Sequence, residues 1–317
     1  MSVGILALLA ALLLPAVSSA REASRAVQCR SRLRSLGHAY AIVGGLKKRP
    51  LNRGHYARQA AEVLEVTLSP TDRSGNDAAL GSRLVCPSDP RAVASHGCLS
   101  YGPNAGLHPL DFGSGAIRQY SDIVSPVDFH DGTSNTMLWS EKVVPFGSST
   151  NDSASALIAA TNDPGRAEPL HYVWYLSNDY TFSDWGNAVP PPDRAGWLPA
   201  SNECIAGGSG TVPLVQVGGQ EHVGSSSASA DFCVLTLPNT RDCLPVKPPA
   251  HAYFARGWLT ANRYLRTASS RHPGKVFVCF ADGSVRPVSE EIDRRVWIRT
   301  GTRAGEENRL PGFDRLP

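Results

Sequence analysis

The sequence predicts an α+β fold, in which one long N-terminal helix precedes a loop-rich, mainly antiparallel β head. Two observations about the bulk of the chain support this prediction. The 29 glycines and 24 prolines among 317 residues indicate many turns. Short apolar runs bounded by turn residues, which are typical of strands, recur after residue 83. With 42% apolar and 19% charged residues, the chain can bury a core and is not globally disordered.

The N-terminus begins with an apolar run, Val3 to Val17, that contains no charge. As a helix, this run is about 22 Å long, which is shorter than the roughly 30 Å of a bilayer core. That length suits the apolar part of a signal peptide, and the small residues 18–20 that follow suit a cleavage site before Arg21. A secreted protein with a cleaved signal peptide is therefore one interpretation.

The residues after this run favour one continuous helix instead. They carry an apolar stripe with steps of three and four residues: Ala26, Cys29, Leu33, Leu36 and Tyr40. The first stop signals are Gly37 and the pair Gly44–Gly45, and Pro15 would kink the helix without ending it. A helix that is apolar at its start and amphipathic afterwards is typical of pilins. We therefore expect residues 1–45 to form a membrane-associated helix and residues 46–317 to form an extracytoplasmic α+β domain.

The segment ILALLAALLLPAVSSAREASRAVQC resembles the start of a large bacterial family, domain-of-unknown-function family 1559. Members of this family usually begin with a prepilin-type cleavage and methylation segment. In the family, a basic leader, a Gly-Phe cleavage point and a membrane-embedded Glu precede this run. The resemblance implies that Met1 falls inside the helix. Either the true start lies upstream, so that the helix is truncated at its front, or this member has lost its processing site.

Two further blocks carry the same resemblance. The first is CPSD, which contains Cys86, Pro87 and Asp89, followed by SYGPN at 100–104. The second is DFHDGTSNTMLWSEKVV at 128–144, in which the singled-out residues are Asp131, Gly132, Ser134, Asn135 and Glu141. Turn and cap chemistry followed by a strand ending near Glu141 accounts for this block. The alternative is that Asp131, Asn135 and Glu141 form a polar cluster that binds a cation or a sugar.

Seven cysteines without CxxC spacing indicate disulfides rather than a zinc site. Short loops of turn-forming residues join Cys86 to Cys98 and Cys233 to Cys243, and we predict both pairs as disulfides in an oxidising compartment. His96 beside Cys98 offers metal binding as the alternative for that loop.

The C-terminal part predicts a β-hairpin, because Asp282-Gly283 separates VFVCF at 276–280 from SVRPV at 284–288. A two-residue type I′ turn would place Phe280 opposite Val285. It would place Val278 opposite Pro287, whose missing N–H indicates an edge strand. Ser289 is the predicted cap of a terminal helix.

His272 begins an H-x9-DG pattern that closes members of the resembled family. In a hairpin, His272 and Asp282 lie at opposite ends of one strand, too far apart to share a proton. We therefore expect a structural His272 that bonds a backbone carbonyl. The alternative is a site assembled with residues from elsewhere, such as Asp131 or Glu141.

Several functional classes receive no support. The chain contains no Walker loop, HExxH, GxSxG or CxxC motif, and a net charge of +3 does not indicate nucleic-acid binding. We expect no enzymatic activity, no cofactor and no metal. The predicted function is a pilin- or pseudopilin-like envelope protein, as in type II secretion-like systems, whose partners are the inner membrane and other pilin-like subunits. The alternative is a secreted glycan-binding protein or hydrolase that uses the aromatic residues between 172 and 185, in a segment (145–250) predicted to be all-β.

Overall fold

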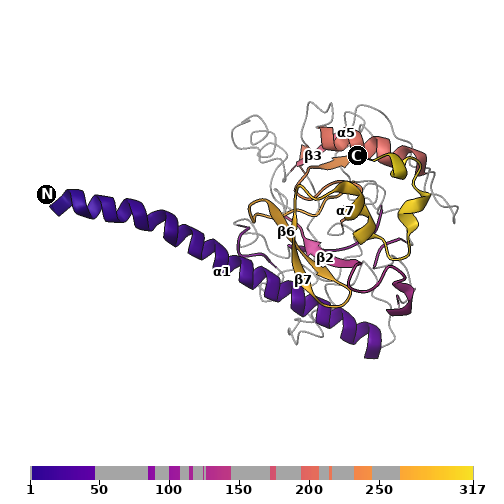
Figure 1. Ribbon diagram of the computed structural model, residues 1–317, viewed down its shortest axis with the longest axis horizontal. Helices are drawn as coiled ribbons and strands as arrows, with labels where there is room; N and C mark the ends of the chain where they lie inside the picture. Colours follow the sequence, from indigo (N-terminus) through magenta and orange to yellow (C-terminus); the bar gives the residue numbers. More distant parts are fainter. Residues whose placement is uncertain are drawn as a thin grey trace, which may run out of the picture.

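The computed structural model describes residues 2–46, 85–89, 100–107, 114–116, 124, 126–143, 172–175, 194–206, 214–215, 232–244 and 265–316. Helix α1 (Ser2–Leu46) is continuous and contains Pro15. Its N-terminal half projects away from the head, whereas its C-terminal half lies along the sheet (Figure 1). The prediction of one long N-terminal helix is confirmed, and so is the α+β class.

The stripe predicted on this helix is the face that packs on the head. Cys29, Leu33 and Leu36 are fully or almost fully buried, and Ala26 and Tyr40 are partly buried against the same core. The residues of the stripe recur on one side of the helix because 3.6 residues complete a turn. Loss of a buried leucine side chain costs about 2–5 kcal/mol, so Leu33 and Leu36 are major contributors to the docking of the helix.

The central sheet has four antiparallel strands in the order β1 (Tyr101–Pro103), β2 (Met137–Glu141), β6 (Lys275–Phe280) and β7 (Val285–Ser289). The predicted strand that ends near Glu141 is therefore confirmed, and the SYGPN block contributes β1. Strand β7 lies at the edge of the sheet, as the proline within it indicates.

Both faces of this sheet are covered, which explains why VFVCF is apolar at every position. Phe277 and Cys279 pack in the core beneath α1. Val276, Val278 and Phe280 face the opposite core, because side chains alternate along a strand. Helices α5 (Trp197–Ala206) and α7 (Arg294–Gly301) supply Trp197, Trp297 and Ile298 to that second core. The arrangement is a helix–sheet–helix sandwich.

A second sheet contains β4 (Leu214–Val215), β3 (Tyr172–Tyr175) and β5 (Asp242–Leu244), with β3 parallel to β5 and antiparallel to β4. The prediction that 145–250 is all-β is wrong, because α5 lies within it. Pro199 in WLPASNECIA does not prevent this helix, because it occupies the first turn, where backbone N–H groups have no partner within the helix. Trp185 and the rest of the predicted aromatic cluster beyond Tyr175 lie outside the described residues.

The C-terminal hairpin is confirmed, but its predicted turn is wrong. Cys279 lies opposite Val285 and Val278 opposite Arg286, so the register differs from the prediction by one residue. The loop has three residues, 281–283, and the amide of Phe280 donates to the carbonyl of Ser284 over 2.9 Å. Within this loop, only Gly283 has a positive φ, 81°. This matches a three-residue loop with glycine in its left-handed position.

The predicted cap of the terminal helix is also wrong. Ser289 is the last residue of β7, and α7 starts after Asp293, whose side chain accepts a hydrogen bond from the amide of Val296. An acidic N-cap satisfies an amide that the first turn leaves unpaired. The short 3-10 segments Pro126–Asp128, Arg194–Gly196, Glu306–Arg309 and Phe313–Arg315 complete the described elements.

Gly37 marks the closest approach of α1 to the hairpin. A Cβ atom at this position would lie 2.6 Å from Sγ of buried Cys279 and 3.5 Å from Cα of Gly283. We expect Gly37→Ala to lower the free energy of unfolding by about 1–3 kcal/mol through overpacking, despite a gain of up to about 1 kcal/mol in helix propensity. Denaturant unfolding measures this difference.

Gly4 provides a matched control in the same helix, because a Cβ atom there would meet nothing within 4 Å. Gly4→Ala should leave the stability of the head unchanged. Combining Gly37→Ala with Cys279→Ala should recover part of the loss, since the clashing sulfur is removed. Equal stability of the Gly37→Ala and Gly4→Ala variants would contradict the close packing described above.

Candidate functional site

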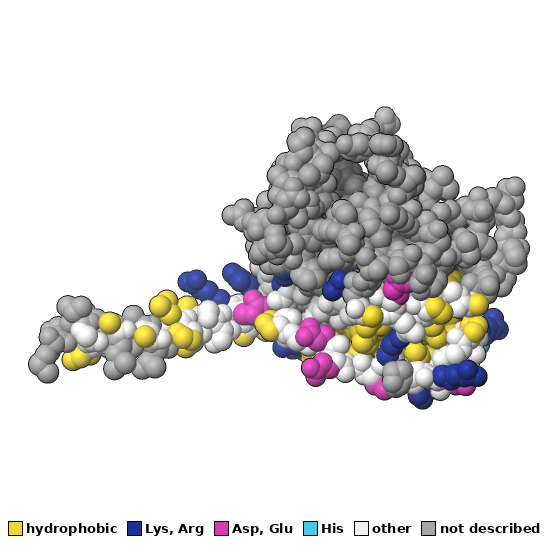
Figure 2. Space-filling view, turned by 90° about the horizontal axis from the view of Figure 1, so that it is seen from above, with side chains coloured by type: hydrophobic (Ala, Val, Ile, Leu, Met, Phe, Trp, Pro, Cys, Tyr) yellow, Lys and Arg dark blue, Asp and Glu magenta, His cyan; other side chains and the backbone are white. Residues whose placement is uncertain are grey.

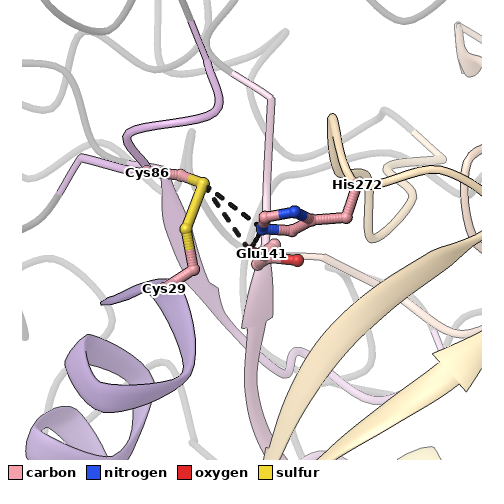
Figure 3. Close-up of side chains that lie close together, drawn as sticks. All are labelled: Cys29, Cys86, Glu141 and His272. Carbon is pink, nitrogen blue, oxygen red and sulfur yellow. Dashed lines mark hydrogen bonds and ion pairs between the residues drawn. A yellow bond between two sulfur atoms is a disulfide. The ribbon is translucent and has the colours of Figure 1, made fainter. Parts of the chain in front are cut away.

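His272 is buried between two carboxylates from distant parts of the chain. Its side chain is 1% exposed; its Nδ1 lies 2.6 Å from Oε1 of Glu22, and its Nε2 lies 3.2 Å from Oε1 of Glu141. The prediction that His272 bonds a backbone carbonyl is wrong, because both ring nitrogens face carboxylates. Of the two residues named in the alternative, the structure brings Glu141, and not Asp131, to His272. Figure 3 shows the imidazole beside Glu141 and Cys86.

The sheet positions Glu141 for this contact. Glu141 ends β2, and β2 pairs with β6, the strand that follows His272. Its Oε2 accepts a hydrogen bond from the amide of Phe277 over 2.8 Å, so its other oxygen points to His272. The ring of Phe277 also lies edge-on to the imidazole, with centroids 5.0 Å apart. Glu141 and the histidine are thereby held by the same strand pair.

Helix α1 supplies the third member of the cluster, Glu22. Its Oε1 also accepts a hydrogen bond from the hydroxyl of Ser88 over 2.9 Å, and its Oε2 lies 3.7 Å from exposed Arg25. The hydroxyl of Ser88 thus contacts the carboxylate rather than the imidazole.

A disulfide between Cys29 and Cys86 lies against the same cluster (Figure 3). Sγ of Cys86 is 3.7 Å from Nε2 of His272 and 3.8 Å from Oε1 of Glu141. The predicted Cys86–Cys98 disulfide is wrong, because docking of α1 brings Cys29 to Cys86 across 57 residues. Cys98 and His96 lie outside the described residues.

The second predicted disulfide is also wrong. Cys243 pairs with Cys204 of α5, while buried Cys233 takes part in neither described disulfide. Cys243 lies in β5, and the bridge joins that strand to α5. The short loop 233–243 suggested a local pair, but the helix, which the sequence did not predict, brings a more distant cysteine to β5.

The two disulfides indicate an extracytoplasmic location, since disulfides persist in oxidising compartments. Within the described ranges, no helix combines the length and the apolar character needed to cross a bilayer.

The electrostatics of the cluster favour a protonated histidine. Burial alone lowers the pKa of His272, but hydrogen bonds and charge attraction from Glu141 and Glu22 outweigh it and hold the pKa above its usual value. A protonated imidazole carries a donor on each nitrogen. It can therefore donate to the carboxylates of α1 and β2 at the same time, which links the helix to the sheet.

A buried ion pair adjoins this cluster. Nζ of Lys142, the residue after Glu141, lies 2.7 and 2.5 Å from the two carboxylate oxygens of Asp242 and donates to the carbonyl of Thr267 over 3.0 Å. Burial lowers the pKa of Lys142, and Asp242 opposes that shift. The pair connects the end of β2 to β5 of the second sheet. Neither residue was predicted as part of a site.

The turn residues of the second predicted block lie away from the His272 cluster and stabilise turns. Oδ2 of Asp131 accepts from the amide of Gly305, Gly132 has a φ of 93°, and the side chain of Asn135 donates to the carbonyl of Asp131. Ser134 is exposed. Glu141 lies at the far end of β2, about 13 Å along the extended strand from Met137 and thus away from the turn that holds Asp131 and Asn135, so the proposed cation- or sugar-binding cluster of Asp131, Asn135 and Glu141 is wrong.

The two Asp-Gly turns contact each other. The amide of Asp282 donates to the carbonyl of Thr133 over 3.0 Å, and the amide of Ala281 donates to that of Thr136 over 2.9 Å. The carboxylate of Asp282 accepts from the amide of Ser284 over 2.8 Å. Asp282 and His272 lie beyond opposite ends of β6, as predicted. The H-x9-DG pattern therefore serves two different contacts of one strand.

The CPSD turn closes one side of the His272 cluster. The amide of Asp89 donates to the carbonyl of Cys86 over 3.0 Å across Pro87 and Ser88, and Asp89 is buried. A small depression of about 170 Å³, including its open mouth, adjoins the turn. Its lining includes Cys86, Asp89, Glu141, Lys142 and Ser270. Of the cluster residues, Cys86 and Glu141 thus line this depression.

The same cluster contains a potential set of metal ligands. One ligand atom each from Cys29, Cys86, Glu141 and His272 lie within 4.8 Å of one another, and all four residues are buried. Here the two sulfurs are bonded to each other. The arrangement therefore holds the helix to the CPSD turn covalently, and its ligand types are those of zinc sites.

Sequence reasoning missed Glu22, although a signal was present. Glu22 is the only acidic residue in the sequence of α1, and it lies four residues before Ala26 and seven before Cys29. These spacings place it on the apolar stripe, one step beyond its predicted start. A lone acid on a buried helix face indicates a buried partner.

Comparison of the chain with protein-family models, with curated proteins and with solved structures finds no match.

We expect the His272 cluster to make stability depend on pH. Because its folded pKa is raised, the cluster stabilises the fold fully below the unfolded value of about 6.5. This contribution is lost as the pH rises through the folded pKa. Glu22→Gln removes one carboxylate that faces the imidazole, and Glu141 and the neighbouring Arg25 remain. The stability difference between wild type and this variant, measured by thermal unfolding, should be largest near pH 6 and smaller at pH 9.

Glu291→Gln is the control for that series, because Glu291 is an exposed acid that follows β7. It should show no comparable trend over the same range. A penalty for Glu22→Gln that stays constant with pH would contradict the role given to the histidine.

The Cys29–Cys86 bridge should account for much of the docking of α1. It closes a loop with a sequence separation of 57 residues, for which chain entropy predicts about 4 kcal/mol. The double variant Cys29→Ser with Cys86→Ser should expose the 26–40 segment to limited proteolysis, while the Cys204–Cys243 bridge remains. Unchanged protection of that segment would show that apolar packing alone holds the helix.

Proposed function

We propose that this chain is a pilin-like envelope protein that is held by its N-terminal helix and acts in assembly or binding. The observation that supports this proposal is the division of α1 into two halves. One half forms a layer of the head, whereas the other projects from it with exposed apolar side chains (Figure 1). The resemblance to domain-of-unknown-function family 1559, with its prepilin-type start, agrees with this proposal.

The exposed surface of the projecting half requires an apolar partner. Ile5, Leu13 and Leu14 are 60%, 60% and 70% exposed, respectively, and Val17 is 45% exposed. Figure 2 shows hydrophobic side chains along this part of the helix and basic side chains near its junction with the head. Burial of each such side chain is worth about 1.5–3 kcal/mol. The inner membrane and the helices of other pilin-like subunits are the proposed partners.

The head supports the same proposal through the direction that it gives the helix. Cys29 is bonded to the turn at Cys86, and Glu22 contacts His272 at the point where the helix leaves the head. These contacts fix the path of the projecting half relative to the sheet. A fixed, apolar rod on a disulfide-containing head suits a subunit that docks against others, with the head in the periplasm or outside.

Carbonate extraction of membranes from cells that express the full chain tests the anchor. We expect the wild-type protein to stay in the membrane pellet at high pH. The double variant Leu13→Glu, Leu14→Glu should move to the supernatant, because a charge on each of two apolar positions opposes burial in lipid. Ser24→Glu is the matched control, since Ser24 is an exposed position of the same helix; it should stay in the pellet.

Cross-linking in intact cells followed by sedimentation tests assembly. Multimers that form with the wild type and are lost with the Leu13→Glu, Leu14→Glu variant would support the proposal. A wild-type chain that is released by carbonate and sediments as a monomer would overturn it. In that case, binding of the soluble protein to a polysaccharide array would favour the secreted glycan-binding alternative.

A further inference from the structure

The atoms around Nε2 of His272 already have the spacing of a tetrahedral metal site. Nε2 lies 3.2 Å from Oε1 of Glu141 and 3.7 Å from Sγ of Cys86, and that sulfur lies 3.8 Å from the same Oε1. A zinc-class ion holds nitrogen and oxygen at about 2.0–2.1 Å and sulfur at about 2.3 Å, so the tetrahedron edges are about 3.3 Å for N–O and about 3.5 Å for S–N and S–O. All three measured separations lie within about 0.3 Å of these edges.

The sulfur of Cys29 would occupy the fourth corner of this tetrahedron. All four ligand atoms lie within 4.8 Å of one another, and the sulfur of Cys29 differs from its place in such a site only by its bond to Cys86. Sulfurs bonded to each other are about 2.05 Å apart, and two thiolates on one zinc-class ion are about 3.8 Å apart. The distance between the sulfurs thus differs by less than about 2 Å between the two arrangements. Rotation of the cysteine side chains can supply this change.

The surroundings of these ligands are those of a metal site as well. A histidine ligand needs its other nitrogen bonded to a carboxylate or carbonyl, which fixes the orientation of its ring. Nδ1 of His272 meets this need with Glu22, and Ser88 in turn donates to Glu22. Glu141 binds the amide of Phe277 through Oε2, which leaves Oε1 directed at the centre of the cluster. The supporting contacts are therefore complete without the metal.

We propose that the reduced chain binds one zinc-class divalent cation through the thiolates of Cys29 and Cys86, Nε2 of His272 and Oε1 of Glu141. Two thiolates select zinc-class ions over magnesium or calcium. The proposal does not depend on the proposed envelope function, because every ligand lies in the head or in the docked half of α1.

The redox step that separates the two states is a thiol–disulfide exchange. A dithiol reductant supplies two electrons and two protons, becomes a disulfide itself, and leaves Cys29 and Cys86 as two thiols. Metal binding then displaces the two thiol protons and the proton on Nε2 of His272, while Nδ1 keeps the proton that it donates to Glu22. Two thiolates, one carboxylate and a divalent cation together carry one negative charge. The guanidinium of Arg32 lies nearby, where it donates to the carbonyl of Val85, the residue before Cys86.

The two states share one structural result. In the oxidised chain, the disulfide joins α1 to the CPSD turn. In the metal-bound chain, the cation would join α1 to that turn and also to β2 and the start of the hairpin. The cluster would therefore keep the helix docked both before and after the disulfide forms.

Cobalt(II) titration of the full chain in detergent tests the site, because tetrahedral thiolate-bound cobalt absorbs characteristically and zinc displaces it. The protein is reduced with a phosphine under anaerobic conditions. We expect one equivalent of cobalt per reduced chain, and no such absorption in the oxidised chain. The variant Cys29→Ser, Cys86→Ser should lose the thiolate-to-cobalt band, whereas Cys204→Ser, Cys243→Ser, which removes the other bridge, should keep it.

The variant Glu22→Gln distinguishes a metal site with supporting contacts from metal binding by two thiols alone. Glu22 contacts only Nδ1 of His272 among the proposed ligands, and loss of such a supporting carboxylate should weaken cobalt binding about 10–100-fold. Zinc should also protect two thiols from alkylation in the wild type. The proposal is overturned if the reduced wild type gives no tetrahedral cobalt spectrum. It is also overturned if the spectrum persists in the Cys29→Ser, Cys86→Ser variant, or if Glu22→Gln binds as tightly as wild type.

Discussion

The burial of one imidazole organises the head of this protein. His272 needs a partner at each ring nitrogen because an unpaired polar group in the core is costly, and its partners come from a helix 250 residues earlier and from a neighbouring strand. Glu22 can reach it only if α1 lies along the sheet, and Glu141 only if β2 pairs with β6. The Cys29–Cys86 bridge and the apolar stripe of α1 then follow from the same docking. Covalent, ionic and apolar contacts thus converge on one end of the sheet.

The docked half of α1 is a structural layer of the head, whereas the projecting half is not. Every described head contact of the helix starts at Glu22, so cleavage before Arg21 would leave the helix–sheet–helix sandwich intact. The fold of the head therefore does not require the projecting half. In the proposed function, the apolar surface of that half, where Leu13 and Leu14 are 60% and 70% exposed, is the part that binds the membrane or other subunits. The head gives this surface a fixed direction.

Sequence periodicity predicted the elements whose signals are local. The stripe from Ala26 to Tyr40, the strand ending at Glu141, the C-terminal hairpin and its edge position all follow from spacing within a few residues. The disulfides did not, because short loops favour local pairs whereas the pairing of Cys86 is decided by the docking of a distant helix. The turn at Asp282 failed for a related reason: Asp-Gly fits two loop types, and contacts with Thr133 and Thr136 accompany the longer one. His272 was predicted to be structural, but its partners lie on other elements, which no local pattern reveals.

The cluster joins four chain segments: α1, the CPSD turn, β2 and the start of the hairpin. It can change between a disulfide and two thiolates only if contacts outside the sulfurs maintain its geometry. Here the outer contacts meet that condition: Glu22 holds Nδ1 of His272, and the amide of Phe277 holds one oxygen of Glu141. Neither contact involves the sulfurs. The imidazole and the carboxylate consequently keep their places whether the two cysteines are bonded to each other or are separate thiolates. In the proposed metal-bound state, the cation takes over from the bridge in holding Cys29 opposite Cys86, and the apolar packing of Leu33 and Leu36 supports the same docking. The same framework that makes the disulfide form between residues 29 and 86 thus also arranges four ligands around one point.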